Sequence, residues 1–462
     1  MYQIDLNHPV PVFFCGIGGI SMSGLAEILH ERGFPVSGSD RAASDLTRSL
    51  EAKGIRILIG QRAENITEDI AVVIFTAAIH PDNPEYVRTQ ELGIPSLSRA
   101  ELLGELMRNY PSSIAVAGTH GKTTTTSMIS EILMHAGLDP TISVGGILDS
   151  IGGNVRIGRS EHFIAEACEY TNSFLSMAPK IGIILNVEAD HLDFFKDLDD
   201  VRHSFRLFAQ RIPPDGTLII CSDIPDLHEL TDGLPCRVVT FGRDAQESDY
   251  YPTGIRYDDN ARPSYNCCHA ASGIRTQRIT LGIPGEHNVI NSLAAVAAAD
   301  LLGIPRDVTA AALSSFGGTR RRFEYKGTWN GVRIIDDYAH HPTEIRATLC
   351  AAEGLAHNRI FCIFQPHTYT RTKALFEEFA DALSLADVLI LADIYAARET
   401  DTLGISSELL ADTIRERGHE ETYWFPSFEE ILAFVRQNCR KGDVLITMGA
   451  GNVTEIGPLL LS

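Results

Sequence analysis

The chain has 462 residues, 44% of them hydrophobic and 21% charged, which is ordinary for globular domains and excludes a collagen-like or mostly disordered chain. At roughly 150 residues per domain, this length predicts about three domains. The net charge of −21 argues against a nucleic acid partner, because an acidic chain repels phosphate backbones. Nine cysteines without a C-x-x-C pair predict free thiols and a cytoplasmic protein. The apolar runs fall short of the ~18 residues of a membrane helix, so membrane insertion is not expected.

The first unit, predicted to span residues 1–109, alternates short apolar strands with helices, which is typical of a parallel sheet. Strands are expected at Val10–Cys15, Pro35–Gly38, Ile55–Ile59 and Ala71–Thr76, and helices at Met22–Arg32 and Arg99–Arg108. The glycine turn Gly16-Ile17-Gly18-Gly19 can bind a pyrophosphate at the start of the first helix. Asp40, 22 residues after Gly18, can bind a ribose hydroxyl. Because Ser21 replaces the third glycine of G-x-G-x-x-G, a dinucleotide site and an ordinary turn are equally compatible with this segment.

The second unit, predicted to span residues 110–321, carries the strongest local signal. The loop Gly118-Thr119-His120-Gly121-Lys122-Thr123-Thr124 follows a strand at Ser113–Ala117 and opens a helix. Its backbone N–H groups can cradle phosphates, Lys122 supplies a charge near the β and γ phosphates, and the Thr123 hydroxyl can ligate Mg²⁺. Val116 stands where a full phosphate-loop motif has its first glycine. Further strands are expected at His162–Cys168, Ile181–Val187 and Thr217–Cys221, short antiparallel strands within 243–280, and a helix at Val289–Leu302.

Three positions in this unit are candidate ligands. Glu166 lies near a strand end, on the face expected to carry Ile164 and Cys168, where it can ligate Mg²⁺. For His191, which follows the next strand, a metal or phosphate contact and a structural role are equally expected. Asn288 and Asn291 share a helix face and can bind adenine or a phosphate–metal shell, although one of them can equally cap the helix.

The third unit, predicted to span residues 322–462, has strands expected at Val332–Asp336, Ile360–Phe364, Val388–Ala392, Tyr423–Phe425 and Val444–Met448. One arginine of Arg320-Arg321-Arg322 can stabilise phosphoryl transfer. The adjacent His340 and His341 should point different ways, which disfavours a two-histidine metal site. A helix predicted to begin at Pro366 places His367 and Arg371 on one face, where they form a pocket for a carboxylate or phosphate.

In their order and spacing, these motifs resemble the Mur ligases, the ATP-dependent amide ligases of peptidoglycan synthesis, over nearly the whole chain. The resemblance is carried by Gly16–Gly24, Gly38–Asp40, Ala78–Glu85, Gly118–Thr124, Asn186–Asp193, His287–Asn291, Arg321–Glu324, Asp336–Pro342, Pro366–Arg371 and Tyr395–Glu399. It implies three α/β domains: an N-terminal Rossmann-like parallel sheet for a UDP-sugar, a central P-loop-type ATPase sheet, and a C-terminal Rossmann-like α/β domain that closes over the site.

The resemblance also implies the reaction, in which ATP and Mg²⁺ serve to join L-alanine to the lactyl carboxylate of UDP-N-acetylmuramate through an acyl phosphate. It assigns ATP to Gly118, Thr119, His120, Gly121, Lys122, Thr123, Thr124, Asn288 and Asn291, and the metal to Thr123, Glu166 and His191. It assigns the substrates to Gly16, Gly18, Gly19, Ser21, Asp40, His80, Tyr338, His340, His367 and Arg371. The implied catalytic residues are Lys122, Arg322, Asp337, His340 and Arg371. We expect a monomer or a weak homodimer.

The sequence departs from the family pattern at Cys168, where an acidic residue is common, and in the altered stretch Glu169–Ser173. The lysine that later Mur ligases carbamylate is missing, with Phe205 near its position, which favours the alanine-adding reaction. A ligase that recycles a tripeptide is the nearest alternative. A nicotinamide-dependent oxidoreductase, based on Gly16–Gly24 and Asp40, and a non-catalytic ATP-binding regulator are more distant ones.

Overall fold

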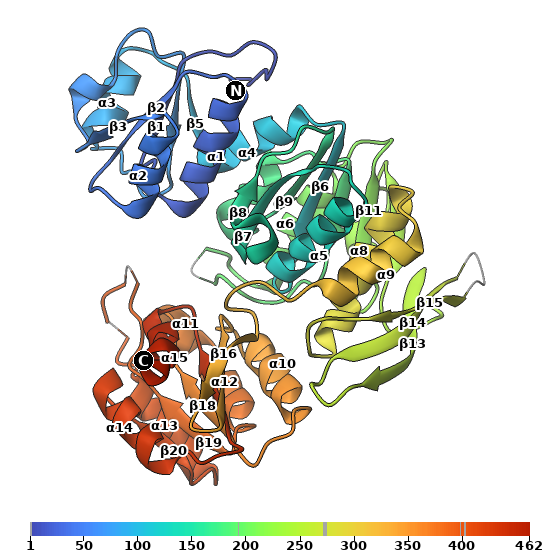
Figure 1. The fold of residues 1–462 in the computed structure, drawn as a ribbon. Coiled ribbons are helices and arrows are strands. Elements are labelled where there is room, and N and C mark those ends of the chain that lie inside the picture. The colour runs from blue at the N-terminus through green and yellow to red at the C-terminus, as the bar shows by residue number, and fades with distance from the viewer. Residues whose placement is uncertain (1, 193, 271–274, 398, 402) are drawn as a thin grey trace.

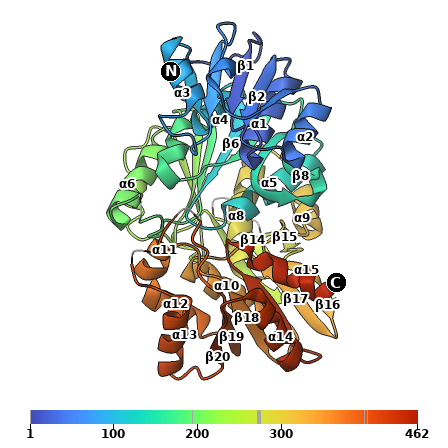
Figure 2. The ribbon, with the colours of Figure 1, turned by 90° about the vertical axis from the view of Figure 1, so that its left-hand side faces the viewer.

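The computed structural model describes residues 2–192, 194–270, 275–397, 399–401 and 403–462. Three α/β units follow one another, each built around its own sheet, and the central unit touches both of the others (Figure 1). Figure 2 shows the N-terminal unit at one end of the molecule and the C-terminal unit at the other. The predicted fold class, three α/β domains with largely parallel sheets, is confirmed.

The N-terminal sheet is fully parallel, with the strand order β3-β2-β1-β4-β5. Its strands are β1 (Val12–Cys15), β2 (Val36–Asp40), β3 (Arg56–Ile59), β4 (Val72–Phe75) and β5 (Ser96–Ser98), and its helices are α1 (Ile20–Glu31), α2 (Asp45–Ala52), α3 (Pro84–Glu91) and α4 (Arg99–Arg108). All four residues of β1 are buried, as a strand covered on both faces requires. The strand order reverses beside β1, so the glycine turn after β1 lies at the switch point where such sheets bind ligands.

The central sheet has ten strands in the order β15-β14-β13-β12-β11-β10-β6-β9-β7-β8. The strands are β6 (Ser112–Ala117), β7 (Thr141–Leu148), β8 (Gly153–Arg156), β9 (His162–Glu166), β10 (Ile181–Ile184), β11 (Thr217–Cys221), β12 (Arg237–Phe241), β13 (Tyr250–Tyr257), β14 (Pro263–His269) and β15 (Arg275–Thr280). The helices are α5 (Lys122–His135), α6 (Leu198–Ala209), α7 (His228–Thr231), α8 (His287–Leu301) and α9 (Arg306–Ser315). The predicted antiparallel strands within 243–280 are present as β13, β14 and β15.

Two strands of this sheet end earlier than predicted. The strand expected at Ile181–Val187 ends at Ile184. The strand expected at His162–Cys168 ends at Glu166, so Cys168 lies beyond it and does not continue the alternation of Ile164 and Glu166. The chain turns at this point into the short helix η3 (Tyr170–Ser176), in which Thr171 and Asn172 have positive φ angles. Cys168 therefore belongs to a loop at the carboxyl edge of the sheet.

The C-terminal sheet has the order β16-β17-β21-β18-β19-β20, with only β16 antiparallel to its neighbour. Its strands are β16 (Glu324–Trp329), β17 (Val332–Asp337), β18 (Ile360–Phe364), β19 (Val388–Leu391), β20 (Thr422–Trp424) and β21 (Val444–Met448). Its helices are α10 (Pro342–Glu353), α11 (Tyr369–Ala374), α12 (Phe376–Leu383), α13 (Ser407–Glu416), α14 (Phe428–Asn438) and α15 (Ile456–Leu461). The helix predicted from Pro366 begins instead at Tyr369, because Thr368 has a φ of +67° and caps the helix with its hydroxyl.

The three units are not joined in the same way. Most buried apolar side chains of the N-terminal and central units form one continuous cluster, from Ile4 to Phe316, while a smaller cluster around Phe13 and Val73 belongs to the N-terminal unit alone. The C-terminal unit has two clusters of its own, and Ala261 is the one central-unit residue among their buried members. The first two units therefore share a core, whereas the third is attached mainly through other contacts. Within the described residues, no helix has the length and apolar character needed to cross a bilayer.

Candidate functional site

The phosphate-loop sequence forms a tight turn between β6 and α5. Gly118 and Gly121 have φ angles of +146° and +83°, which glycine adopts without strain. A Cβ on Gly118 would lie 2.9 Å from Leu185 Cβ, so the turn is also packed too closely for a larger residue. Asn186 holds the backbone of His120 from both sides, since its side chain accepts the His120 N–H at 2.7 Å and donates to the His120 carbonyl at 3.1 Å. The loop is therefore rigid before any ligand binds.

Lys122 is held in this turn by a carboxylate that the site prediction did not include. Its Nζ lies 2.9 Å from Glu169 Oε2 and also donates to the Gly118 and Thr119 carbonyls at 2.5 and 3.0 Å. Burial lowers the Lys122 pKa, but Glu169, Cys168 and Glu166 together outweigh this effect, so the pKa lies above its usual value. Lys122 is thus a half-buried cation at neutral pH. Glu169 was overlooked because it begins a stretch that departs from the family pattern.

A cavity lies in front of the phosphate loop, between the central and C-terminal units. It is lined by His120, Gly121, Thr124, Asn186, Glu188, Ile283, His287, Asn288, Asn291, Gly318, Thr319, Arg322, Phe323, Asp337, Thr343, Glu344, Ala347 and Thr348. The predicted Asn288 and Asn291 therefore meet Arg322 and Asp337 here. Neither asparagine is the N-cap of α8, which is Glu286. The Asn288 amide instead donates to the Pro284 carbonyl at 2.7 Å, and the Asn291 amide donates to Asn288 Oδ1 at 3.2 Å.

The three consecutive arginines have different surroundings. Arg320 forms a pair with Asp149 at 2.9 Å on the surface. Arg321 is turned into the C-terminal unit, where it donates to the Gly449 carbonyl at 2.6 Å and lies 3.3 Å from Asp336. Arg322 is the one of the three that lines the cavity. The alternating directions of neighbouring side chains thus direct a single cation to the site.

Asp337 is fixed at the end of β17 by two backbone N–H groups. It accepts those of Phe323 and Ala339 at 2.8 and 2.7 Å. Burial raises the Asp337 pKa to about 6, although Arg322 and these two N–H groups act in the opposite direction. The carboxylate is therefore available to a ligand mainly above that pH.

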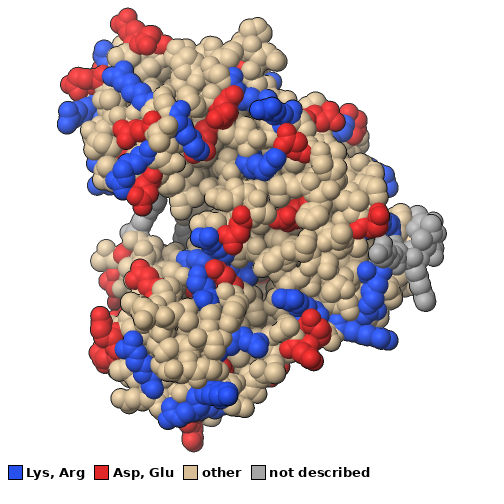
Figure 3. Space-filling view, viewed as in Figure 1, with Lys and Arg blue, Asp and Glu red and all other residues tan. Residues whose placement is uncertain are grey.

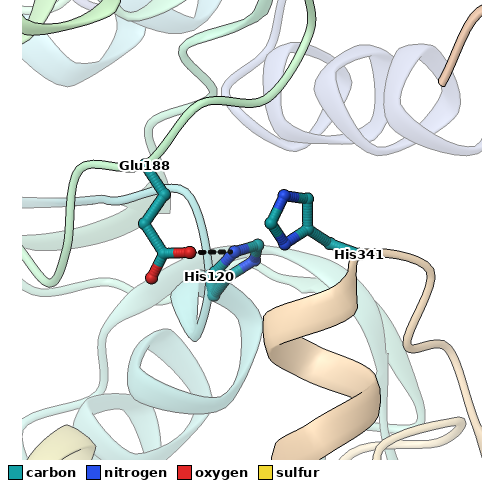
Figure 4. A group of neighbouring side chains, drawn as sticks. All are labelled: His120, Glu188 and His341. Carbon is teal, nitrogen blue, oxygen red and sulfur yellow. Dashed lines mark ion pairs between the residues drawn. The ribbon is translucent and has the colours of Figure 1, made fainter. Parts of the chain in front are cut away.

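The predicted metal ligands lie around the loop. Thr123 is buried at the start of α5, and Glu166 accepts the Gly145 N–H at 2.5 Å. His191 has a φ of +55°, lies against the Tyr170 ring, and has its Nε2 3.9 Å from Glu169 Oε1. A hydroxyl and carboxylates are the oxygen donors that Mg²⁺ prefers, so the residues present fit that ion. His120, Glu188 and His341 form a separate group close enough for a metal (Figure 4).

A second cavity adjoins the loop from the side of α11. It is lined by Tyr170, Ala189, Asp190, His191, Leu192, His367, Thr368, Thr370, Arg371, Ala374, Leu375 and Glu399. The predicted pair of His367 and Arg371 is present, with Nδ1 and Nη1 3.4 Å apart, despite the later helix start. Arg371 donates from Nε and Nη2 to the same Asp190 oxygen at 3.2 and 3.1 Å. Burial raises the Asp190 pKa, but Arg371 and the neighbouring histidines together outweigh this effect, so the net shift is downward.

Tyr338 and His340 follow the carboxyl end of β17 and are not among the residues that line this second cavity. The Tyr338 ring lies beneath the guanidinium groups of Arg321 and Arg322, at 4.8 and 5.2 Å. The His340 backbone N–H donates to Glu344 at 3.1 Å, and its ring is 6.3 Å from His367. Tyr338 thus contacts Arg322, whereas His340 lies between Glu344 and the group formed by His367 and Arg371, whose charge also acts on it.

A third cavity belongs to the N-terminal unit. It is lined by Gly16, Gly18, Gly19, Asp40, Arg41, Gln61, Thr76, Ala78, Ile79, His80, Asp82, Asn83 and Pro84. The predicted glycines, Asp40 and His80 are all present, and Asp40 accepts the Gly18 N–H at 2.8 Å. Arg41, Gln61 and Thr76 were not predicted, although their positions after strand ends could have indicated them.

Ser21 lies apart from these residues. It accepts a hydrogen bond from Arg99 at 3.1 Å and lines a further cavity, between the first two units, with Glu166 and Cys168. Figure 3 shows the molecule hollowed between its N-terminal and C-terminal units, with charges of both signs interspersed over this face. Asp193 and Arg398, which belong to two of the resembling stretches, lie outside the described residues.

Comparisons with known proteins cover the whole chain. Residues 11–111 match the family "Mur ligase family, catalytic domain", residues 116–299 the "Mur ligase middle domain", and residues 321–451 the "Mur ligase, glutamate ligase domain". The chain is 58% identical to a UDP-N-acetylmuramate–L-alanine ligase of Agathobacter rectalis and 57% identical to one of Lachnospira eligens, with 100% of each chain covered.

Solved structures agree with this result. A UDP-N-acetylmuramate-alanine ligase from Thermotoga maritima superposes with a TM-score of 0.79 at 30% identity, over 98% of both chains. A murein peptide ligase from Psychrobacter arcticus gives 0.70 at 25% identity, also over 98% of both chains. The three family models match in the expected order, the relatives match over their full length, and the fold is shared. The chain belongs to the Mur ligase family.

Proposed function

We propose that this chain joins L-alanine to the lactyl carboxylate of UDP-N-acetylmuramate, with ATP converted to ADP and phosphate. The observation that carries this proposal is the 58% identity, from end to end, to a ligase named for that reaction. The tripeptide-recycling alternative rests on a weaker likeness, at 25% identity to a murein peptide ligase. Neither the oxidoreductase nor the regulator that the sequence left open is favoured by these relatives.

In the proposed reaction, a lactyl carboxylate oxygen attacks the γ-phosphorus of ATP and ADP leaves. The amine of alanine then attacks the acyl carbon, and the resulting tetrahedral intermediate expels phosphate. Positioning and charge neutralisation account for most of the catalysis in such transfers. Lys122 and Arg322 are the cations that we assign to the transferred phosphoryl group, from opposite sides of the cavity.

Thr123 and Glu166, with His191, are the residues that would hold Mg²⁺, which neutralises phosphate charge when bound. The Asn288–Asn291 pair lies at the far wall of the same cavity, where its amides can hold the nucleotide. Asp337 is oriented by two backbone N–H groups and faces this cavity beside Arg322. The roles of Asn288, Asn291, Arg322 and Asp337 are supported by their position around one cavity.

For the sugar nucleotide we propose the N-terminal cavity, with the glycine turn, Asp40 and His80 as ligands. Arg371 and His367, in the cavity beside the phosphate loop, are assigned to the carboxylate of the substrate or of alanine, because Arg binds a carboxylate in a fixed geometry. The Arg371 guanidinium is already paired with Asp190. An incoming carboxylate would therefore have to displace Asp190 or bind Arg371 together with it. Tyr338, beside Arg322, and His340, near His367, are assigned to the substrates.

Three coarser features complete the proposal. We divide the chain into domains at residues 1–109, 110–321 and 322–462. We place the enzyme in the cytoplasm, because all nine cysteines are free and ATP is its substrate. We expect it to act as a monomer or weak homodimer, with no nucleic acid partner.

The test is ADP release from ATP and Mg²⁺ with UDP-N-acetylmuramate, with and without L-alanine. Parallel reactions use the tripeptide L-Ala-γ-D-Glu-diaminopimelate, or UDP-N-acetylglucosamine, which lacks the lactyl carboxylate. Release that needs both UDP-N-acetylmuramate and alanine supports the proposal. ADP release that needs UDP-N-acetylmuramate and the tripeptide, but does not occur with alanine, would assign the chain to the recycling reaction. ADP release with UDP-N-acetylglucosamine would contradict the acyl phosphate.

A further inference from the structure

The side chain of His120 has no role in shaping the phosphate loop, although it lies within it. Asn186 already satisfies both backbone groups of this residue. The ring, with 11% of its side-chain surface exposed, points away from the loop toward α10 of the C-terminal unit. Neither phosphate binding nor packing within the central unit explains why a histidine side chain is largely enclosed at this position.

Two carboxylates from different units flank this ring. Nδ1 lies 3.3 Å from Glu344 Oε1 on α10, and Nε2 lies 3.5 Å from Glu188 Oε2 in the loop after β10. A neutral imidazole has one N–H, so only the imidazolium can face a carboxylate with a proton on each nitrogen. Burial alone lowers the His120 pKa, but the two carboxylates raise it to about 9. His120 is therefore a cation between two anions at neutral pH.

Further contacts join the same two units around this ion pair. The Thr343 hydroxyl donates to Glu188 Oε2 at 2.7 Å, and the His341 Nε2–H donates to the Ala189 carbonyl at 3.3 Å. The rings of His120 and His341 lie 4.6 Å apart (Figure 4). Because the C-terminal unit shares little apolar core with the central unit, these polar contacts make up a notable part of its attachment.

Glu344 extends the connection to the cavity. Its carboxylate lies 3.8 Å from Arg322 Nη1 and accepts the His340 backbone N–H at 3.1 Å. One carboxylate thus contacts both the phosphate loop, through His120, and the arginine assigned to the phosphoryl group. A shift of α10 relative to the loop would therefore change the contact that Glu344 makes with the Arg322 guanidinium.

A metal ion is the other occupant to consider, because His120, Glu188 and His341 lie within ligand distance of a common point. Both nitrogens of His341 are already engaged, however. Its Nδ1 accepts the Thr343 N–H at 3.3 Å as the cap of α10, and its Nε2 faces the Ala189 carbonyl. A metal would have to take the lone pair that caps this helix. The geometry therefore favours a histidine held by two ion pairs over a metal centre.

We propose that His120 is a positioning residue, whose bridge between Glu188 and Glu344 sets α10 on the phosphate loop and thereby places Arg322 at the transferred phosphoryl group. This inference rests on the proposed function. Misplacement of a catalytic group by about 1 Å can cost on the order of 100-fold in rate. The expected consequence of breaking the bridge is accordingly a loss in kcat, with less change in KM for ATP.

The first experiment is a double-mutant cycle on kcat with His120→Gln, Glu344→Gln and both together. We expect each single variant to lose between about 10-fold and 100-fold and the double variant to lose little more, because either change breaks the same bridge. His135→Gln is the matched control, since His135 forms a pair with Glu131 at the far end of α5. Additive losses in the cycle would overturn the proposal.

The second measurement is the pH profile. The groups that face His120 are Glu188 from the central unit, and Glu344, His341 and Arg322 from the C-terminal side. Because the His120 pKa is raised to about 9, the bridge is complete at neutral pH and is lost between about pH 8 and about pH 10. The wild-type kcat should fall over that range, whereas His120→Gln should lack this step. An identical basic limb in both proteins would contradict the proposal.

The third measurement separates this inference from the proposed function, because it needs no turnover. Hydrogen exchange at the start of α10 should be faster in His120→Gln than in the wild type, while exchange in α5 stays unchanged. Unchanged exchange at α10 would contradict the bridge even if the ligase activity is established. Stoichiometric Zn²⁺ binding by the wild type that His120→Gln abolishes would replace the bridge with a metal site.

Discussion

The molecule contains two glycine turns that share one backbone design but differ in the side chains around them. Gly16–Gly19 follows β1 and opens α1, and Gly118–Gly121 follows β6 and opens α5. Both turns use glycines with positive φ, and both lie at the carboxyl edge of a parallel strand. In the first turn the nearest charged group is the Asp40 carboxylate, which accepts the Gly18 N–H. In the second turn the nearest charged group is the Lys122 ammonium, which is paired with Glu169.

This difference indicates what each turn can do. Backbone N–H groups at a helix N-terminus bind an anion without further help. Transfer of a phosphoryl group also needs cations that neutralise the charge moving to the leaving oxygen. The second turn has a fixed cation and nearby oxygen donors, whereas the first has an anion and polar side chains. We therefore expect changes at the second turn to lower kcat and changes at the first to raise KM.

The largest effect is expected for Lys122. Lys122→Met should lower kcat for ADP formation by roughly 10³-fold, because it removes the preorganised cation. The same change leaves the buried Glu169 unpaired, which can cost about 3–5 kcal/mol of stability. The variant Lys122→Met with Glu169→Gln separates the two effects, since it should regain the thermal stability but not the activity. Recovery of turnover in that double variant would contradict the role of Lys122.

The next largest effect is expected for Arg322, which adds a second cation to the same turn from the C-terminal unit. Arg322→Ala should lower kcat by about 10²-fold or more, as expected when an arginine that stabilises phosphoryl transfer is removed. Steady-state kinetics with ATP as the varied substrate is the measurement. A rise in KM alone, with kcat unchanged, would show that Arg322 binds the nucleotide without acting on the transfer.

A smaller effect, on a different kinetic constant, is expected at the first turn. Asp40→Ala should raise KM for the UDP-sugar by roughly 10-fold, since a hydrogen bond to a charged group contributes about 1.5–3 kcal/mol. The kcat value should remain close to that of the wild type, because Asp40 lies in the N-terminal cavity, away from the phosphate loop. A loss in kcat at saturating substrate would remove the distinction between the two turns.

Much of the fold could be predicted from the sequence, because buried parallel strands are continuous apolar runs. Arg99–Arg108, Thr217–Cys221, Ile360–Phe364 and Val444–Met448 have the bounds that were expected. The predictions failed where local geometry overrides composition. The strand that begins at His162 ends at Glu166. The helix expected from Pro366 begins at Tyr369, because the Thr368 hydroxyl caps it there.

The site could be predicted only in part, for a physical reason. Residues such as Lys122 and Asp40 can be recognised from the sequence, because each lies at a characteristic spacing from a glycine turn. Glu169 and Glu344 are not, since their partners, Lys122 and His120, come from other segments of the chain. The sequence could not decide which of three arginines enters the cavity, because that depends on the direction of the chain between two units.

The smallest effect is expected for Arg320, two residues before Arg322. Its pair with Asp149 is exposed on both sides, with 53% and 72% of the side-chain surfaces accessible, and such pairs contribute about 0–1 kcal/mol. Arg320→Ala should therefore keep kcat and both KM values within about twofold of the wild type and hardly change the melting temperature. If Arg320→Ala instead lost as much activity as Arg322→Ala, the total positive charge of residues 320–322 would explain both results. Only unequal losses show that orientation, and not charge alone, makes the second turn catalytic.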